Sequence, residues 1–167
     1  VGPAIYGGAT LTCSLDPMIV KPLGTISDLY IILALPKVKI LTKKSRQIVP
    51  DKVRLSDCIH NMANTASITA AFCNNNYELL QDSLVDFIVE PKRSMLIPGF
   101  PQAKEAAFTA GAHGMTISGS GPTVFAITNS SNDCAKIESA MKNAFTESDI
   151  ECETFITTPS IQGVRLV

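Results

Sequence analysis

The chain has 167 residues, of which 46% are hydrophobic and 17% charged, and its formal net charge is −1 at pH 7. This composition is typical of a globular protein, and the length suits one domain, or one domain with part of another. The balanced charge excludes a broad polycationic surface, so we expect no nucleic-acid partner.

The cysteine spacing and the hydropathy pattern indicate the cellular compartment of the protein. No apolar run reaches the roughly 18 residues of a membrane span, so we expect no membrane partner. The five cysteines are widely spaced and form no C-x-x-C pair. This spacing favours buried thiols in a reducing compartment over a zinc site or a disulfide framework, and the chain is predicted to be cytoplasmic.

Short β-like runs open the chain. Residues 9–15 and 18–23 are predicted to be strands, separated by a turn at Asp16-Pro17. Residues 29–35 are almost wholly apolar, as in a strand that is covered on both faces.

Helical patterns follow these strands. A short helix is predicted over 42–49, and a longer one from a cap at Ser56 or Asp57 to Phe72. A third helix is predicted over 77–88, where the apolar residues keep a helical spacing.

The remainder of the chain alternates helices and strands. The predicted elements are a helix over 101–110 closed by Gly111, strands over 115–118 and 123–128, a helix over 134–145 capped by Asp133, and strands over 153–158 and 164–167. Together these elements predict an α+β fold with one sheet backed by helices on one face.

A glycine-rich bend is the most informative segment for function. Residues 116–123 read Thr-Ile-Ser-Gly-Ser-Gly-Pro-Thr, with two predicted strands around the bend. Glycines let backbone N–H groups approach an anion, and the serine hydroxyls add donors. The segment has neither the Gly-Lys-Ser/Thr ending nor the G-x-G-x-x-G of common nucleotide-binding loops. The pattern therefore fits either a structural hairpin or a loop that lines an anion site.

Two arginines are candidates for gripping a carboxylate. Arg46 follows a basic turn on the predicted short helix, and Arg93 lies between two prolines in a predicted stiff loop. Each carries a planar guanidinium that can bind a carboxylate through two hydrogen bonds, which lysine cannot do. The alternative is that both are ordinary surface arginines, since spacing alone does not show that they converge.

Several segments, taken in order, resemble one enzyme family. Residues 88–99, Ile-Val-Glu-Pro-Lys-Arg-Ser-Met-Leu-Ile-Pro-Gly, are similar to the substrate-side loop of homoserine kinases. Residues 114–123 resemble the third signature of the wider superfamily of galactokinase, homoserine, mevalonate and phosphomevalonate kinases. Residues 1–8 resemble a mid-chain segment of homoserine kinases, and residues 162–165 resemble their closing strand.

The resemblance implies a fold and a domain division. It predicts a ferredoxin-like C-terminal kinase domain over 27–167, preceded by the last strands of an N-terminal kinase domain over 1–26. It also implies transfer of the γ-phosphoryl group of ATP, with Mg2+, to the side-chain hydroxyl of L-homoserine in threonine biosynthesis. A homodimer is the expected assembly of the full-length protein.

The resemblance also assigns roles to individual residues. Arg46 and Arg93 match positions that hold the carboxylate of the substrate. Four residues match the loop that borders the substrate and phosphate region, and we call them the glycine loop: Ser118, Gly119, Ser120 and Gly121. No catalytic residue and no metal ligand is assigned within this chain.

One superfamily segment is missing from the sequence. The phosphate loop, Pro-x-x-x-Gly-Leu-Gly-Ser-Ser-Ala, occurs nowhere in the 167 residues. Because phosphoryl transfer depends on such a cradle and on Mg2+, this chain alone is expected to be inactive. The alternatives are a mevalonate-pathway kinase of the same superfamily and a stand-alone ferredoxin-like module that binds a small molecule.

Overall fold

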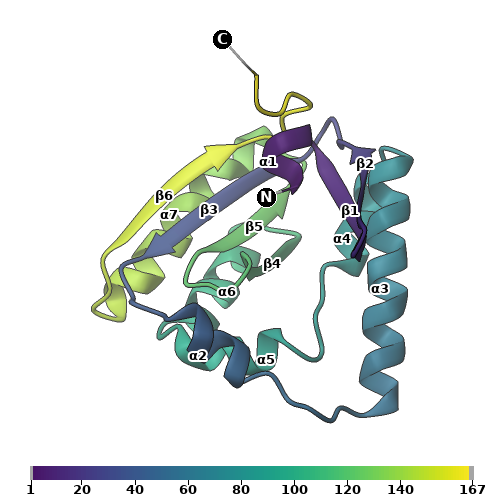
Figure 1. The fold of residues 1–167 in the computed structure, drawn as a ribbon. Coiled ribbons are helices and arrows are strands. Elements are labelled where there is room, and N and C mark those ends of the chain that lie inside the picture. The colour runs from purple at the N-terminus through teal and green to yellow at the C-terminus, as the bar shows by residue number, and fades with distance from the viewer. Residues whose placement is uncertain (1, 166–167) are drawn as a thin grey trace.

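The structure, a computed structural model that describes residues 2–165, is built around a four-stranded antiparallel sheet with the order β4-β5-β3-β6 (Figure 1). The strands are β3 (Tyr30–Pro36), β4 (Gly114–Ile117), β5 (Val124–Thr128) and β6 (Cys152–Thr157). Helix α6 (Phe100–Thr109) precedes β4, and helix α7 (Ser131–Glu147) joins β5 to β6. This β-α-β-β-α-β order is that of a ferredoxin-like fold, and the predicted α+β class is confirmed.

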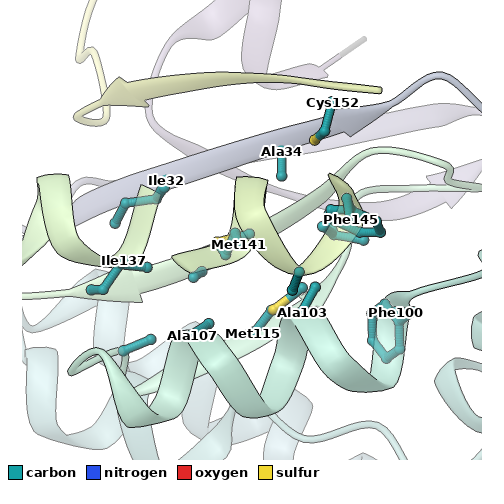
Figure 2. Packing of buried hydrophobic residues seen from close by; sticks show 14 of the residues in the cluster. Ile32, Ala34, Phe100, Ala103, Ala107, Met115, Ile137, Met141, Phe145 and Cys152 are labelled. Atoms are coloured by element: carbon teal, nitrogen blue, oxygen red, sulfur yellow. The ribbon is translucent and has the colours of Figure 1, made fainter. Parts of the chain in front are cut away.

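The main core lies between the sheet and helices α6 and α7 (Figure 2). Alternate residues of β3, Ile32 and Ala34, point into it and are fully buried. From α7, Ile137, Met141 and Phe145 recur every four residues on one face, as an amphipathic helix requires. The alanines of α6 at 103 and 107 are also fully buried, and their small size lets α6 pack closely against α7.

A second, smaller core covers part of the opposite face of the sheet. Helices α3 (Leu55–Cys73) and α4 (Tyr77–Ser83) contribute Ala71, Tyr77 and Leu80, which pack against Ile127 of β5. The prediction that helices cover only one face is therefore wrong, because α3 and α4 shield one end of the other face.

Strand β3 is not covered along its whole length. Its outer face passes from half-buried Ile31 and Leu33 to Leu35, which is 38% exposed. The apolar run at 29–35 had predicted a strand covered on both faces, and the structure contradicts this at the Leu35 end. Hydrophobic composition alone does not show which neighbours a strand has.

A separate two-stranded sheet precedes this domain in the chain. Strands β1 (Ala9–Leu15) and β2 (Met18–Gly24) form an antiparallel pair, as predicted, after the short helix α1 (Gly2–Tyr6), which the sequence analysis did not predict. Gly8 has a φ of +59°, and a Cβ there would lie 2.4 Å from the carbonyl oxygen of Gly24. Only glycine fits this close approach of the chain.

Helix starts differ from the sequence expectations. Helix α3 begins at Leu55 after Arg54, so neither Ser56 nor Asp57 is its N-cap; Asp57 instead lies 2.9 Å from the Arg54 guanidinium. Helix α7 begins after Ser130, which places Asp133 within its first turn. Both carboxylates are still favourable there, since the N-terminal end of a helix carries partial positive charge.

Three further segments depart from the predictions. The helix predicted over 77–88 ends at Ser83, because Leu84 leaves the helical region at ψ 57°. Residues 164–165 are not a strand, and 166–167 lie outside the described residues. Helix α2 (Thr42–Gln47) is shorter than expected, and a short helix α5 (Glu90–Arg93) with a 3-10 turn η1 (Ser94–Leu96) replaces the predicted loop.

Within residues 2–165, no helix is both long enough and apolar enough to cross a lipid bilayer.

The packing of α7 yields a stability prediction. Replacing fully buried Phe145 with alanine should lower the free energy of unfolding by about 3–5 kcal/mol, because the aromatic ring leaves a cavity in the main core. Urea unfolding followed by circular dichroism measures this change. Phe155, which is 52% exposed on β6, is the matched control, and Phe155→Ala should cost well under half as much. Equal losses in the two variants would contradict this assignment of the core.

Candidate functional site

The glycine loop forms the tight connection between β4 and β5. The Ser118 N–H donates to the Thr123 carbonyl at 2.8 Å, and the Gly121 N–H donates to the Ser118 carbonyl at 3.1 Å. Gly119 and Gly121 have φ values of +60° and +75°, which other residues adopt only with strain. The two glycines are therefore needed to close the bend, and Ser118 and Gly119 are left exposed.

Arg93 contacts the glycine loop directly. It is the last residue of α5, and its half-buried guanidinium donates from Nη1 to the Gly119 carbonyl at 2.9 Å. Its Nε donates to the Ser45 carbonyl of α2 at 3.2 Å. Arg93 thus joins two segments that are distant in sequence, and its remaining N–H groups, which have no acceptor among residues 2–165, can bind a ligand.

Ser45 is the second link to the loop, and the sequence analysis did not single it out. Its side chain is fully buried, and its hydroxyl donates to the Ser120 carbonyl at 2.7 Å. Its own carbonyl, in the last turn of α2, receives the Arg93 hydrogen bond. A serine within a short basic turn gives no sequence signal for this role, since the contact depends on a loop that lies 75 residues away.

Arg46 lies next to Ser45 on α2, but no hydrogen bond joins its side chain to the glycine loop. It is exposed and makes no hydrogen bond or ion pair with any residue in the described range 2–165. The structure therefore brings Arg93 and the glycine loop into contact, and it places Arg46 on the helix that Ser45 and Arg93 fasten to that loop.

Asp86 holds the start of the segment that carries Arg93. Its carboxylate accepts from the N–H groups of Ile88 at 2.8 Å, Val89 at 2.9 Å and Glu90 at 3.1 Å. The Nδ2 of Asn61 on α3 donates to the same carboxylate at 2.8 Å. The N-cap of α5 is Val89, so Asp86 acts from outside the usual capping position, and an aspartate near a Glu-Pro pair is only a weak sequence signal for this role.

The surroundings of Asp86 fix its charge state. Burial by itself raises the pKa of this carboxyl, but the hydrogen bonds from Val89, Asn61, Ile88 and Glu90 together outweigh it and lower the pKa below 3.8. Asp86 is therefore ionised at neutral pH, which strengthens the bonds that order the start of α5.

Two side chains connect α5 and α3 to the rest of the domain. Glu90 forms an ion pair with Lys104 of α6, and the two side chains are 12% and 28% exposed. On the other side, Nδ2 of Asn64 on α3 donates to the Val85 carbonyl at 2.8 Å. Helix α5 is therefore held from both α3 and α6, which limits the movement of Arg93.

A cavity of about 230 Å³ lies beside this scaffold. It is bounded by α3, by the segment between α4 and α5, and by Thr116 of β4, and its lining residues are Asn61, Asn64, Thr65, Ile68, Ser83, Leu84, Val85, Asp86 and Thr116. Neither arginine nor the glycine loop belongs to this lining. Arg93 and the glycine loop instead lie at the turn end of the β4–β5 hairpin.

Potential metal-ligating side chains and cysteine thiols do not gather into one site in the described part of the chain. No group of three or more His, Cys, Asp or Glu side chains there is arranged to hold a metal ion. The five cysteines are free thiols, and burial raises the pKa of Cys134 and Cys152.

Comparisons with known proteins identify the family. A family model described as "GHMP kinases C terminal" matches residues 68–147. The homoserine kinase of Chloroherpeton thalassium is 35% identical over 166 residues, which cover 99% of this chain and 52% of the relative. The homoserine kinase of Pyrococcus furiosus is 39% identical over 157 residues, which cover 94% of this chain and 52% of the relative.

Solved structures agree with this result. The crystal structure of homoserine kinase from Cytophaga hutchinsonii superposes with a TM-score of 0.93 at 40% identity, over 98% of this chain and 52% of that one. Mevalonate kinase from L. major, solved with R-mevalonate, has a TM-score of 0.64 at 16% identity, which shows a shared fold only.

The chain carries a C-terminal domain of the GHMP kinase superfamily, which the family model matches at residues 68–147. Within that superfamily it is similar to homoserine kinases along nearly its whole length. The chain spans about half the length of the curated relatives that it matches.

Asp86 provides a prediction about pH. Asp86→Asn should lower the free energy of unfolding at neutral pH by about 1–2 kcal/mol, because the neutral amide accepts hydrogen bonds more weakly. The folded pKa lies below the unfolded value of about 3.8, so the carboxylate stabilises the fold above that pH. This contribution is lost as the pH falls through the folded pKa, and the variant should lose less stability than wild type in that acidic range.

Chemical denaturation at a series of pH values from about 2 to 7 tests this sign. Exposed Asp82 on α4 is a matched control, and Asp82→Asn should change stability by less than about 0.5 kcal/mol. Parallel pH profiles for wild type and Asp86→Asn would show that Asp86 does not order the start of α5.

Proposed function

We propose that this chain forms the substrate-side half of an ATP-dependent homoserine kinase. The observation that carries the proposal is the contact of Arg93 with the glycine loop, within a chain that is 35–39% identical to homoserine kinases over nearly all its residues. The contact holds a carboxylate-binding side chain beside backbone N–H groups that can face an anion. L-Homoserine is the proposed substrate, and its side-chain hydroxyl is the proposed phosphoryl acceptor.

The proposal divides the chain into two regions. Residues 1–26, which contain β1 and β2, belong to the end of the N-terminal kinase domain. Residues 27–167 form the C-terminal domain with the ferredoxin-like sheet. The separate pairing of β1 with β2 supports this boundary, since no strand of the main sheet pairs with either within the described residues.

The arginines and the loop receive distinct roles. Arg46, exposed on α2, offers a free guanidinium to the carboxylate of the amino-acid substrate. Arg93 offers the N–H groups that its two carbonyl partners leave free. The glycine loop borders the same ligand through the N–H groups and hydroxyls of its exposed tip.

ATP and Mg2+ are proposed to bind mainly outside these residues. The superfamily phosphate loop is absent from the sequence, and the described residues offer no ligand cluster that fits Mg2+. The assignment to threonine biosynthesis, in the cytoplasm and as a homodimer at full length, rests on the homoserine kinase proposal.

Two other functions are separable by experiment. A mevalonate-pathway kinase shares the fold and also takes a substrate with a carboxylate, so the arginines alone do not distinguish it. A stand-alone ferredoxin-like module that binds a small molecule would need no further kinase half. Phosphorylation of L-homoserine, compared with that of mevalonate, separates the first alternative from the proposal.

A chimeric enzyme tests the proposal directly. The chain by itself should show no ATP-dependent phosphorylation of L-homoserine, because the phosphate cradle is absent. A chimera should be active if this chain replaces the matching half of the Cytophaga hutchinsonii enzyme, which is 40% identical to it. A coupled assay for ADP release measures both. Activity on mevalonate but not on L-homoserine, or a folded and inactive chimera, would refute the proposed substrate.

The two arginines give a more specific prediction. In the active chimera, Arg46→Ala or Arg93→Ala should weaken transition-state stabilisation for L-homoserine by about 2–4 kcal/mol, measured as kcat/KM, if the carboxylate pair is desolvated. Arg54, exposed at the start of α3, supplies a matched control, and Arg54→Ala should leave kcat/KM unchanged. Unchanged kinetics in both test variants would remove the arginines from the substrate site.

A further inference from the structure

Three consecutive carbonyls of the glycine loop are held by the protein. The Ser118 carbonyl accepts from the Gly121 N–H at 3.1 Å, and the Gly119 carbonyl accepts from Arg93 at 2.9 Å. The Ser120 carbonyl accepts from the Ser45 hydroxyl at 2.7 Å. Each carbonyl is thus directed toward the body of the domain or across the turn, and away from a ligand at the tip.

The peptide geometry decides where the N–H groups point. In a trans peptide the N–H lies opposite the carbonyl of the preceding residue. With the Ser118 and Gly119 carbonyls bound by the Gly121 N–H and by Arg93, the N–H groups of Gly119 and Ser120 point away from those two donors. Among residues 2–165 these two N–H groups have no acceptor, and the hydroxyls of Ser118 and Ser120 have no partner.

Packing does not fix this orientation. A Cβ added to Gly119 would have no atom within 4 Å, so the tip of the loop has space to rotate. Glycine itself imposes little restriction on φ and ψ. The peptide planes are therefore restrained by hydrogen bonds. Arg93 holds the Gly119–Ser120 peptide, and Ser45 holds the Ser120–Gly121 peptide, whose N–H in turn binds the Ser118 carbonyl and so orients the Gly119 N–H. Because Ser45 is fully buried, water cannot readily replace its hydroxyl.

We propose that Ser45 is a positioning residue, which together with Arg93 turns the glycine-loop carbonyls inward so that the Gly119 and Ser120 N–H groups face an anion. The anionic group is a carboxylate or a phosphoryl group, the two that the proposed kinase reaction brings to this loop. This inference rests on the proposed function for the origin of the anion. The inference assigns Ser45 to the substrate site as a residue that acts through the glycine loop and does not itself contact the substrate.

NMR on the 167-residue chain tests the inference without a kinase assay. Backbone amide shifts are followed while inorganic phosphate, and in a second series acetate, is added. The Gly119 and Ser120 amides should shift with saturation, and the probe that binds more tightly identifies the anion. In Ser45→Ala, affinity at these amides should fall about tenfold, a change that one lost hydrogen bond can produce. Ser45→Thr, which keeps the hydroxyl, should retain most of the affinity.

Ser83 provides the matched control. It is a second buried serine, 4% exposed, and its hydroxyl donates to the Leu79 carbonyl on α4 rather than to the loop. Ser83→Ala should lower stability without changing anion affinity. Equal affinity in wild type and Ser45→Ala, equal weakening in both alanine variants, or no shift in wild type would each overturn the proposal.

Amide hydrogen exchange covers the case in which Ser45→Ala does not fold. In wild type, the Gly119 and Ser120 amides should exchange rapidly and become protected when the anion is added, while the Ser118 amide stays protected by its bond to Thr123. Protection of Gly119 and Ser120 without anion would overturn the proposal. Anion binding at the loop together with an inactive chimera would refute the homoserine kinase assignment alone, so the two failures are distinguishable.

Discussion

The geometry of the candidate site depends on one cation that bridges two backbone carbonyls. The Arg93 guanidinium binds the carbonyl of Ser45, in the last turn of α2, and that of Gly119, at the tip of a hairpin. Neither carbonyl is paired within a helix or a sheet, so each needs a partner from a side chain or from water. A planar guanidinium satisfies both at once and joins α2 to the β4–β5 connection.

This bridge is supported by a series of hydrogen bonds that reaches the rigid parts of the domain. Asn61 on the long helix α3 binds Asp86, and Asp86 orders the start of α5, which carries Arg93. The hairpin on the other side of the bridge grows out of the ferredoxin-like sheet, whose main core packs against α6 and α7 (Figure 1). A site built in this way keeps its geometry because regular elements, rather than mobile loops, hold its side chains.

Part of the site was predictable, and the reason is local chemistry. The glycine loop can be recognised in the sequence because two closely spaced glycines suit a bend that needs positive φ. Arg93 can be recognised because an arginine between two prolines is a candidate for binding a carboxylate. Ser45 could not be found in this way, since its role is defined only by the Ser120 carbonyl 75 residues away. Asp86 is an intermediate case: its position before α5 is a local signal, but its bond to Asn61 is not.

The sequence alone determined the features that depend on neighbours along the chain. Alternating or continuous apolar runs determined the strands, the four-residue spacing of Ile137, Met141 and Phe145 determined the buried face of α7, and the residue motifs pointed to the kinase family. Only the tertiary structure decided that α3 and α4 cover part of the second face of the sheet, and that Arg93 binds loop and helix carbonyls. Those outcomes depend on contacts between residues that are 26 to 75 positions apart in the chain. A local sequence pattern does not show which distant residues meet, so it cannot predict these contacts.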